Sequence, residues 1–221
     1  MKNVQRTGFA FFIFSILFLS SCKKDNFNLS ADIKNIIPTT MLKELKSKGM
    51  AINEGTTPPS IEGIYLASPY TLKSPYGAGD SWVAGRVIPD YKYKFYDQTG
   101  GNVKVDYKQP SASDHGSGLG SFISGSGNKF SIFSESNGGT SSIEYTTVSV
   151  ISGELTSTGI KDFQYGFIFT KKTGDDGDVN YIPKGKSRVW IDGDAFADKV
   201  STFRMGINSI NISDISAMGS K

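Results

Sequence analysis

The chain contains very little of the side-chain chemistry on which most catalytic and metal sites depend. Its 221 residues include one cysteine, Cys22, and one histidine, His115. With a single cysteine no disulfide can form within the chain, and the residues after Cys22 contain no thiol nucleophile. His115 lies in a glycine- and serine-rich stretch, which is a poor place for the general base of a Ser-His-Asp triad. We therefore expect no catalytic residue, no cofactor and no structural metal site.

One enzymatic alternative stays open, because paired carboxylates cannot be recognised from a sequence. Glu62, Glu135, Glu144 and Glu154 are available. Glycoside hydrolysis depends on the distance between two carboxyl groups, which only a structure reveals. Our expectation is a protein that is not an enzyme.

An acidic turn near residue 178 comes close to a calcium motif without completing it. Asp176, Asp178 and Asn180 match the first three ligand spacings of a calcium loop. Tyr181 stands where that loop requires glycine, and Ser187 stands where it requires glutamate. The pattern favours an ordinary acidic turn.

Net charge is also small. The chain has 24 Lys and Arg against 21 Asp and Glu, a formal charge of +3. Lys2 and Arg6 fall in an N-terminal segment that we expect to be removed, which leaves the rest nearly neutral. Nucleic-acid-binding proteins carry a basic patch or stripe. We expect no nucleic-acid partner.

The first residues have the pattern of an export signal. The apolar run from Phe9 to Leu19 is shorter than the roughly 20 residues that span a bilayer. Leu19-Ser20-Ser21-Cys22 resembles the lipobox of bacterial lipoproteins. The resemblance implies a signal peptide over residues 1–21 and lipidation of Cys22 by fatty acids such as palmitate. The protein would then be held on a membrane by its lipid anchor.

Residues 22–57 read as a lipidated tether with a short helix. Lys23-Lys24-Asp25-Asn26 and the later pattern Gly49-Met50, Gly55, Pro58-Pro59 and Ile61-Glu62-Gly63-Ile64-Tyr65 are similar to uncharacterised lipoproteins of Bacteroidota. That resemblance implies an outer-membrane lipoprotein of the cell envelope. A second lysine replaces the first acid of the surface-export signal of that phylum, so the periplasmic and surface faces both remain open.

The stretch from Ser30 to Gly49 has the best helical pattern in the chain. Pro38 interrupts it, and Met41, Leu42 and Leu45 form one apolar stripe. Such stripes usually mark a core-facing surface. We expect a helix that closes one end of the following domain, with a partner-binding helix as the alternative.

Residues 58–215 read as a β domain. Prolines at both ends confine a first strand from Ile61 to Ser68. Tyr91, Tyr93 and Phe95 alternate with polar residues, as in a half-buried strand. Further strands are expected at residues 103–108, 120–126, 129–134, 142–155, 163–170 and 188–191, with a last alternation at Phe203, Met205 and Ile207.

About eight antiparallel strands joined by short turns fit a calycin-like up-and-down barrel or a two-sheet β-sandwich. Sequential hairpins favour the barrel. Gly63-Ile64-Tyr65 also resembles the Gly-x-Trp signature of lipocalin-type barrels. The resemblance implies that Arg204, near the last strand, covers Tyr65 at the closed end.

Two functions follow from the two architectures. A barrel would bind a small apolar or amphipathic molecule, and a sandwich would bind carbohydrate or act as an adhesin at the cell surface. Residues 70–89 are expected to form a long loop around Trp82, either a binding loop or an ordinary surface excursion.

The most aromatic face in the chain comprises Phe163, Tyr165, Phe167 and Phe169, and we expect it to point inward toward Tyr93 and Phe95. An eight-stranded barrel is either filled by side chains or holds one small ligand. In the first case these residues are core alone. In the second case they line the ligand site, and the expected ligand-binding residues are Tyr65, Tyr93, Phe95, Tyr165 and Phe167.

Overall fold

The computed structural model describes residues 27–175 and 181–203. This part of the chain contains two helices and one sheet of twelve strands. The helices are α1 (Ala31–Ile36) and α2 (Thr39–Ser47). The strands are β1 (Thr56–Thr57), β2 (Gly63–Ala67), β3 (Tyr70–Ser74), β4 (Val87–Ile88), β5 (Tyr91–Thr99), β6 (Asn102–Lys108), β7 (His115–Ser126), β8 (Lys129–Gly139), β9 (Glu144–Leu155), β10 (Gly159–Thr173), β11 (Ser187–Asp192) and β12 (Phe196–Val200).

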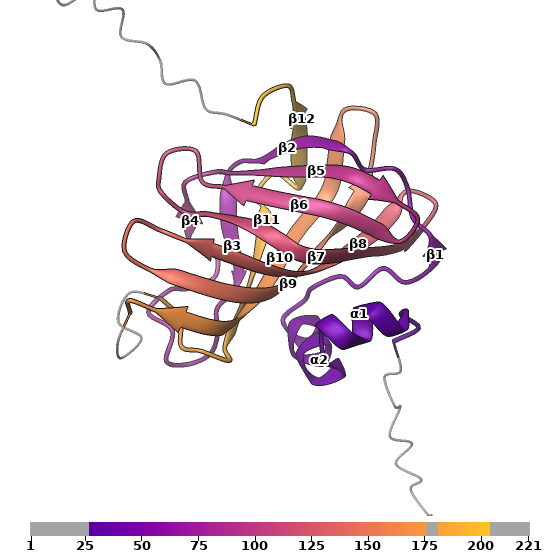
Figure 1. Ribbon diagram of the computed structural model, residues 1–221. Coiled ribbons are helices and arrows are strands. Elements are labelled where there is room, and N and C mark those ends of the chain that lie inside the picture. The colour runs from indigo at the N-terminus through magenta and orange to yellow at the C-terminus, as the bar shows by residue number, and fades with distance from the viewer. Residues whose placement is uncertain (1–26, 176–180, 204–221) are drawn as a thin grey trace, which may run out of the picture.

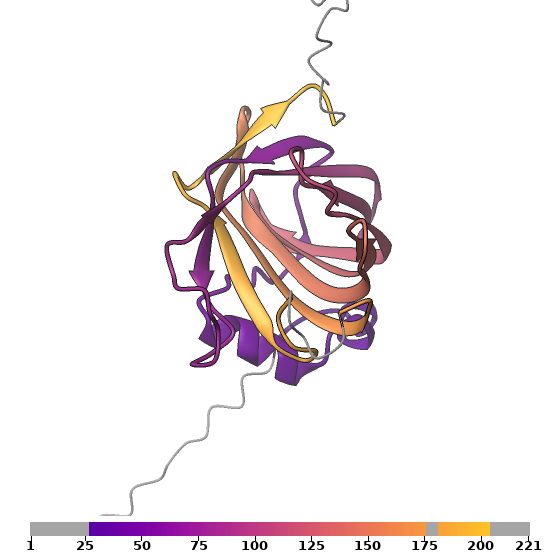
Figure 2. The same ribbon diagram turned by 90° about the vertical axis from the view of Figure 1, so that its left-hand side faces the viewer.

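The sheet closes on itself. The neighbours run β12-β2-β5-β6-β7-β8-β9-β10, and β10 pairs again with β12, so eight strands form a ring. Figure 1 shows the wall from the side, and Figure 2 looks along the ring from the end at which β5 and β7 begin. Every pairing in the ring is antiparallel. The expected closed barrel is confirmed, and the sandwich is not the fold.

The short strands are segments of longer ones. Ala67 of β2 faces Tyr91 of β5, and after the bend at Ser68-Pro69 the same register continues with Tyr70 of β3 facing Ile88 of β4. β11 and β12 likewise follow one another as two segments of one strand. Both pair with β10 on one side, and on the other side β11 pairs with β3 and β12 pairs with β2. The barrel is thus an up-and-down meander with bends in three of its strands.

Three sequence expectations need correction here. Residues 70–74 and 87–88 are strands rather than loop, because the pairing of β3 with β11 and of β4 with β3 overrides their proline-flanked composition. Residues 115–119 belong to β7, although the strands expected from the sequence did not include this glycine- and serine-rich stretch. The last described strand is β12 at 196–200, which the alternation did not reveal. Met205 and Ile207 lie outside the described residues.

The helices form where the sequence predicted them, with Ser30 as the N-cap of α1 through its hydroxyl and the Ile33 N–H. They do not close an end of the barrel. They pack on the outer wall, where a second core joins them to β8, β9 and β11 (Figure 1). A Cβ at Gly166 would lie 3.0 Å from Leu45, so the glycine lets α2 approach the wall.

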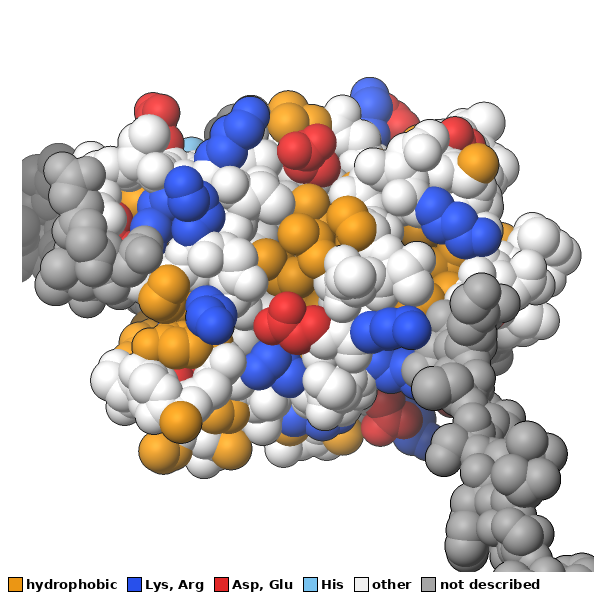
Figure 3. All heavy atoms as spheres, turned by 90° about the horizontal axis from the view of Figure 1, so that it is seen from below, with side chains coloured by type: hydrophobic (Ala, Val, Ile, Leu, Met, Phe, Trp, Pro, Cys, Tyr) orange, Lys and Arg blue, Asp and Glu red, His pale blue; other side chains and the backbone are white. Residues whose placement is uncertain are grey.

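Seen from below, this outer face carries scattered lysines and arginines with acidic side chains between them (Figure 3). Within the part of the chain that the structure describes, neither helix has the length and apolar character needed to cross a bilayer.

After α2 the chain crosses the outer wall as an extended strap. Serine hydroxyls on the wall donate to its backbone: Ser152 to Ala51 O at 2.8 Å and Ser124 to Asn53 O at 2.6 Å. The Asn53 N–H in turn donates to Ser131 Oγ at 2.8 Å. These bonds satisfy polar groups that the strap covers, which removes the penalty of burying them. The β domain therefore includes residues before position 58.

One end of the barrel interior is filled. Tyr65, Phe95 and Phe163 are each 1% exposed. They pack among aliphatic side chains, which include Val103, Val105, Ile123, Ile132, Ile151 and Ile160. Arg204, expected to cover Tyr65, lies outside the described residues. The Lys199 ammonium lies 6.0 Å from the centroid of the Tyr65 ring.

Candidate functional site

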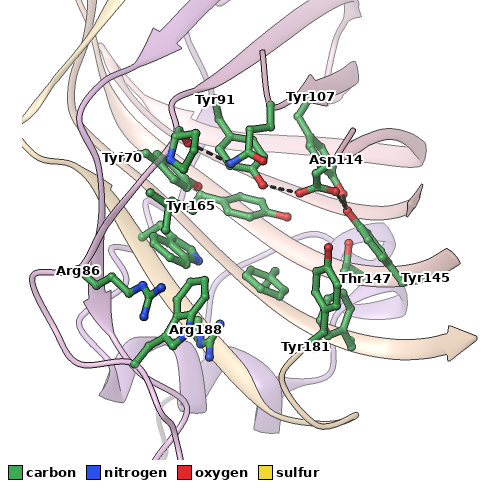
Figure 4. Close-up of a pocket in the computed structure, with 17 residues that line it drawn as sticks. Tyr70, Arg86, Tyr91, Tyr107, Asp114, Tyr145, Thr147, Tyr165, Tyr181 and Arg188 are labelled. Carbon is green, nitrogen blue, oxygen red and sulfur yellow. Dashed lines mark hydrogen bonds between the residues drawn. The ribbon is translucent and has the colours of Figure 1, made fainter. Parts of the chain in front are cut away.

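The other end of the barrel contains a cavity of about 410 Å³. It lies where β5, β7, β9 and β11 begin, the end that faces the viewer in Figure 2. Its wall consists mainly of aromatic rings with a few charged and polar groups (Figure 4). The lining residues are Tyr70, Trp82, Arg86, Ile88, Pro89, Tyr91, Tyr107, Gln109, Asp114, Tyr145, Thr147, Tyr165, Phe167, Phe169, Tyr181, Arg188 and Trp190.

Two glycines position the rings on one side of the cavity. A Cβ at Gly116 would lie 2.5 Å from Cζ of Tyr107, and a Cβ at Gly138 would lie 2.4 Å from Cε2 of Tyr145. Real side chains cannot approach so closely, so both rings depend on the absence of a side chain in the neighbouring strand. Glycine within a strand often marks such a close approach.

Asp114 is the centre of the polar network in the cavity. The hydroxyls of Tyr91 and Tyr145 both donate to its carboxylate, each to a different oxygen. The Tyr107 hydroxyl lies 3.1 Å from that of Tyr145. Because Tyr145 has one proton and gives it to Asp114, Tyr107 is the donor in that second bond. Figure 4 shows the carboxylate between the three hydroxyls.

This carboxylate forms no ion pair in the described part of the chain, where the ion pairs join other residues. Burial raises the pKa of Asp114, and the hydrogen bonds from Tyr145 and Tyr91 offset part of that rise. Burial also raises the pKa of Tyr145, and the charge of Asp114 raises it further. The tyrosines therefore stay protonated and remain donors.

The mouth of the cavity is built on a second polar cluster. Arg188 makes a bidentate ion pair with Asp80, with bonds of 2.9 and 2.6 Å. The backbone N–H groups of Tyr76 and Trp82 also donate to Asp80. Burial alone would raise the pKa of Asp80, but these bonds outweigh burial and lower it. The ion pair fastens the loop between β3 and β4 to the barrel.

Trp82 lies at this mouth in contact with three neighbours. The guanidinium carbons of Arg86 and Arg188 lie 4.0 and 4.3 Å from its ring centroid. Its edge meets Trp190, with 5.9 Å between centroids. Trp190 in turn stacks on Tyr70 at 5.2 Å. The loop around Trp82 is therefore a wall of the cavity, not an unattached surface excursion.

One buried polar atom in the wall lacks a partner. Thr147 is 1% exposed, and its Oγ1 makes no hydrogen bond of acceptable geometry, although it lies beside the Tyr165 hydroxyl. It is the single such side-chain atom among the described residues. An unpaired buried hydroxyl costs free energy, and a ligand in the cavity offers a way to satisfy it.

No family model matches the chain, and no curated protein or solved structure does. The site must therefore be interpreted from its own geometry and chemistry.

The expected ligand-binding residues divide between the two ends. Tyr165 and Phe167 line the cavity. Tyr65 and Phe95 lie in the filled end, and Tyr93 lies beneath the cavity, where its hydroxyl bonds that of Tyr70 at 2.7 Å. The aromatic face of β10 points inward as expected, since Phe163 and Tyr165 lie 5.0 and 5.6 Å from Tyr93. Cys22 lies outside the described residues.

Sequence reasoning missed the charged residues of the site. Asp114, Arg86 and Arg188 belong to no motif, and the hydrogen-bond partners of Asp114 and Arg188 are far away in the chain. The glycines of β7 and β8 were the one signal of the site in the sequence. Glycine in a strand indicates that another group approaches the backbone closely, but it does not show that the group is a tyrosine ring. In the described ranges 27–175 and 181–203, no three His, Cys, Asp or Glu side chains come together as a metal site. Asp176, Asp178 and Asn180 of the near-calcium motif lie outside those ranges.

Proposed function

We propose that this protein is a lipid-anchored protein of the bacterial cell envelope that binds a small amphipathic molecule in the aromatic end of its barrel. The observation that carries the proposal is the cavity of about 410 Å³, lined by rings and by a few buried polar groups. Ligand sites in proteins commonly have volumes of roughly 300–1,000 Å³ and this mixture of apolar wall and sparse polar groups.

The rings supply most of the binding energy in this proposal. Six tyrosines, two tryptophans and two phenylalanines line the cavity. Their faces offer apolar contact, and their hydroxyls and the Thr147 Oγ1 offer hydrogen bonds at fixed places. A ligand with an apolar body and one or two polar groups satisfies both kinds of surface. A purely apolar ligand would leave Asp114 without a counter-charge and the Thr147 Oγ1 without a hydrogen bond.

The anchor places this cavity near a membrane. If Cys22 is lipidated, residues 23–26 alone separate it from Phe27, which is buried against the helices on the outer wall. Four extended residues and their flanking bonds reach no more than roughly 20 Å. The barrel would then stay close to the bilayer surface, where amphipathic molecules concentrate.

A surface carbohydrate platform is not favoured by the geometry. The alternative function required a two-sheet sandwich, and a stacking platform on its surface would need an exposed ring such as that of Trp82. The fold is a closed ring, and Trp82 already contacts two guanidinium groups and Trp190. A carbohydrate bound within the cavity is instead an outcome that the first experiment below would reveal.

Native mass spectrometry of protein purified from its own host tests the ligand proposal. We expect wild-type protein to carry a small molecule that organic extraction releases, and Phe167→Ala protein to carry less of it. Both tryptophans of the chain line the cavity, so extraction and readdition should also change the intrinsic fluorescence. Protein without any bound molecule, and without a fluorescence response to its host's lipid extract, would contradict the proposal.

A separate variant tests the anchor. Cys22→Ser is expected to abolish incorporation of a radiolabelled fatty acid and to leave the protein unprocessed or released, because stable anchoring requires acyl chains. Ser21→Ala, which keeps the cysteine and a small residue before it, is the matched control. Equal labelling of Cys22→Ser and wild type would remove the anchor from the proposal and leave the cavity untouched.

A further inference from the structure

We propose that the inner part of the cavity binds the ammonium group of an organic cation, with the Asp114 carboxylate as its counter-ion and the neighbouring tyrosine rings as a cage. The ligand class is an arylalkyl amine or a quaternary ammonium compound of similar size. This inference rests on the proposed function, because it assumes that the cavity takes a small molecule.

The hydrogen-bond directions show which form of Asp114 the network is built for. Tyr91 and Tyr145 each donate their single proton to the carboxylate, and Tyr107 donates to Tyr145. The chain of donors thus ends on an acceptor that has no proton of its own to give. A carboxylate has about four lone-pair sites, and the two hydroxyls and the His115 backbone N–H occupy three of them, so one remains. Asp114 is held as an anion with spare capacity.

The cavity wall leaves that anion without a counter-charge. Among the described residues no Lys, Arg or His forms an ion pair with Asp114. His115, the next residue, is exposed, and its Nδ1 interacts with Ser113 O. Burying an unpaired carboxylate is costly, and a cation that enters the cavity removes that cost.

The surrounding rings complement a cation as well. Tyr107 lies 6.4 Å from Tyr91 and 6.2 Å from Tyr165 between ring centroids, and Tyr145 lies 6.4 Å from Tyr181. Ring faces attract cations, and cages of several rings recognise ammonium groups. An anionic group at the same place would face both the carboxylate and these faces.

The positive end of the cavity is elsewhere. Arg86 lies at the mouth, and Figure 4 shows it across the cavity from Asp114, with Tyr165 between them. Arg86 makes no ion pair among the described residues, whereas Arg188 is paired with Asp80. A ligand oriented with its ammonium group inward and a polar or anionic group outward matches both ends.

Three probes that share a 2-phenylethyl group and differ in charge test the inference by isothermal titration calorimetry: 2-phenylethylamine, 2-phenylethanol and 3-phenylpropanoate. At pH 7.5 we expect the amine to bind at least tenfold more tightly than the alcohol, and the carboxylate to bind most weakly. Asp114→Asn should weaken amine binding at least tenfold and change alcohol binding less than twofold.

Asp97→Asn is the matched control. It makes the same chemical change far from the cavity. Tyr91 at the start of β5 lines the cavity, whereas Asp97 near the end of β5 is exposed and pairs with Lys104. It should leave all three affinities within twofold of wild type. A pH series on wild-type protein avoids variants altogether: amine affinity should fall as Asp114 is protonated at acidic pH, while alcohol affinity stays constant.

The outcomes separate the two proposals. Binding of all three probes with equal affinity, or tightest binding of the carboxylate, would overturn the cation inference and leave a small-molecule cavity in place. Amine binding that Asp114→Asn does not change would overturn it too. Failure of every probe to bind, together with absence of any molecule in protein from the host, would overturn both.

Discussion

The filled end and the cavity end of the barrel use the same kinds of ring on the same strands and differ in what those rings face. On β10, Phe163 packs at the filled end and Phe167 lines the cavity. On β6 the inward residues change from Val103 and Val105 to Tyr107. The difference lies in the side chains that face these rings across the barrel interior. At the filled end they are aliphatic, and at the cavity end they are small.

The small residues belong to β7, β8 and β9. Ser121 and Ser134 bond one another inside the wall, and Gly116, Gly138 and Thr147 continue toward the mouth. A cavity therefore does not require missing aromatic residues. It requires that their neighbours be too small to fill the remaining space, because protein interiors otherwise pack closely. The lesson is that glycine and serine on inward positions locate a site better than the rings do.

The largest expected effect is a difference in stability between two alanine variants of β10. Phe163→Ala should lower the free energy of unfolding by about 3–5 kcal/mol, because it empties a fully packed site. Phe167→Ala should cost about 1–2 kcal/mol, because its ring is partly buried and already borders a cavity. Urea titrations of both variants provide the measurement.

Ligand content should change in the reverse order. Phe167→Ala removes a ring that lines the cavity, and Phe163→Ala removes none. Equal losses of stability in the two variants would mean that the cavity end is packed as tightly as the other, which would break the comparison.

The barrel was predictable because its strands obey a local rule. Tyr91, Tyr93 and Phe95 alternate with polar residues, and tight glycine turns join most strands in sequence order. The exceptions are β3 and β4, which were expected to be loop because prolines and glycines surround them. Their pairing with β11 and with one another supplies the stability that local propensity does not.

The site was less predictable because its geometry comes from long-range contacts. Asp114 is separated by 23 residues from Tyr91 and by 31 from Tyr145. Nothing in the composition near Asp114 marks it, since it follows a serine-rich turn. The helices illustrate the same limit: the stripe of Leu42 and Leu45 predicted burial, but not the outer wall of β8, β9 and β11 as the partner.

A smaller effect is expected from Gly138→Ala. The added Cβ would meet Tyr145 Cε2 at 2.4 Å and the Tyr107 hydroxyl at 2.7 Å, so both rings must move. We expect a loss of about 1–3 kcal/mol in stability, as for other overpacked sites, and a larger proportional loss of ligand binding. Gly120→Ala on β7 is the control, because its Cβ meets no atom within 4 Å. If both variants bind ligand like wild type, the position of Tyr145 is unimportant for the site.

The smallest expected effect concerns Asp114 and the pH dependence of stability in ligand-free protein. Burial raises the pKa of Asp114 in the folded state above its ordinary value. Between the unfolded and folded pKa values the folded protein therefore binds more protons than the unfolded chain, so stability falls as pH rises through that window. Asp114→Asn lacks this titration. Its stability relative to wild type should therefore increase as pH rises through that window.

Thermal unfolding at a series of pH values measures this difference, with Asp97→Asn as the exposed carboxyl that should follow the wild-type slope. The sign of the difference in stability between Asp114→Asn and wild type is the informative result. If the carboxylate is retained for stability, Asp114→Asn should be less stable than wild type at neutral pH, because the hydroxyls of Tyr91 and Tyr145 lose the carboxylate that accepts their hydrogen bonds. A carboxylate retained for binding makes the variant at least as stable while it loses the amine. Stability gained together with affinity lost would show that the cavity end, unlike the filled end, holds a group that folding alone does not favour.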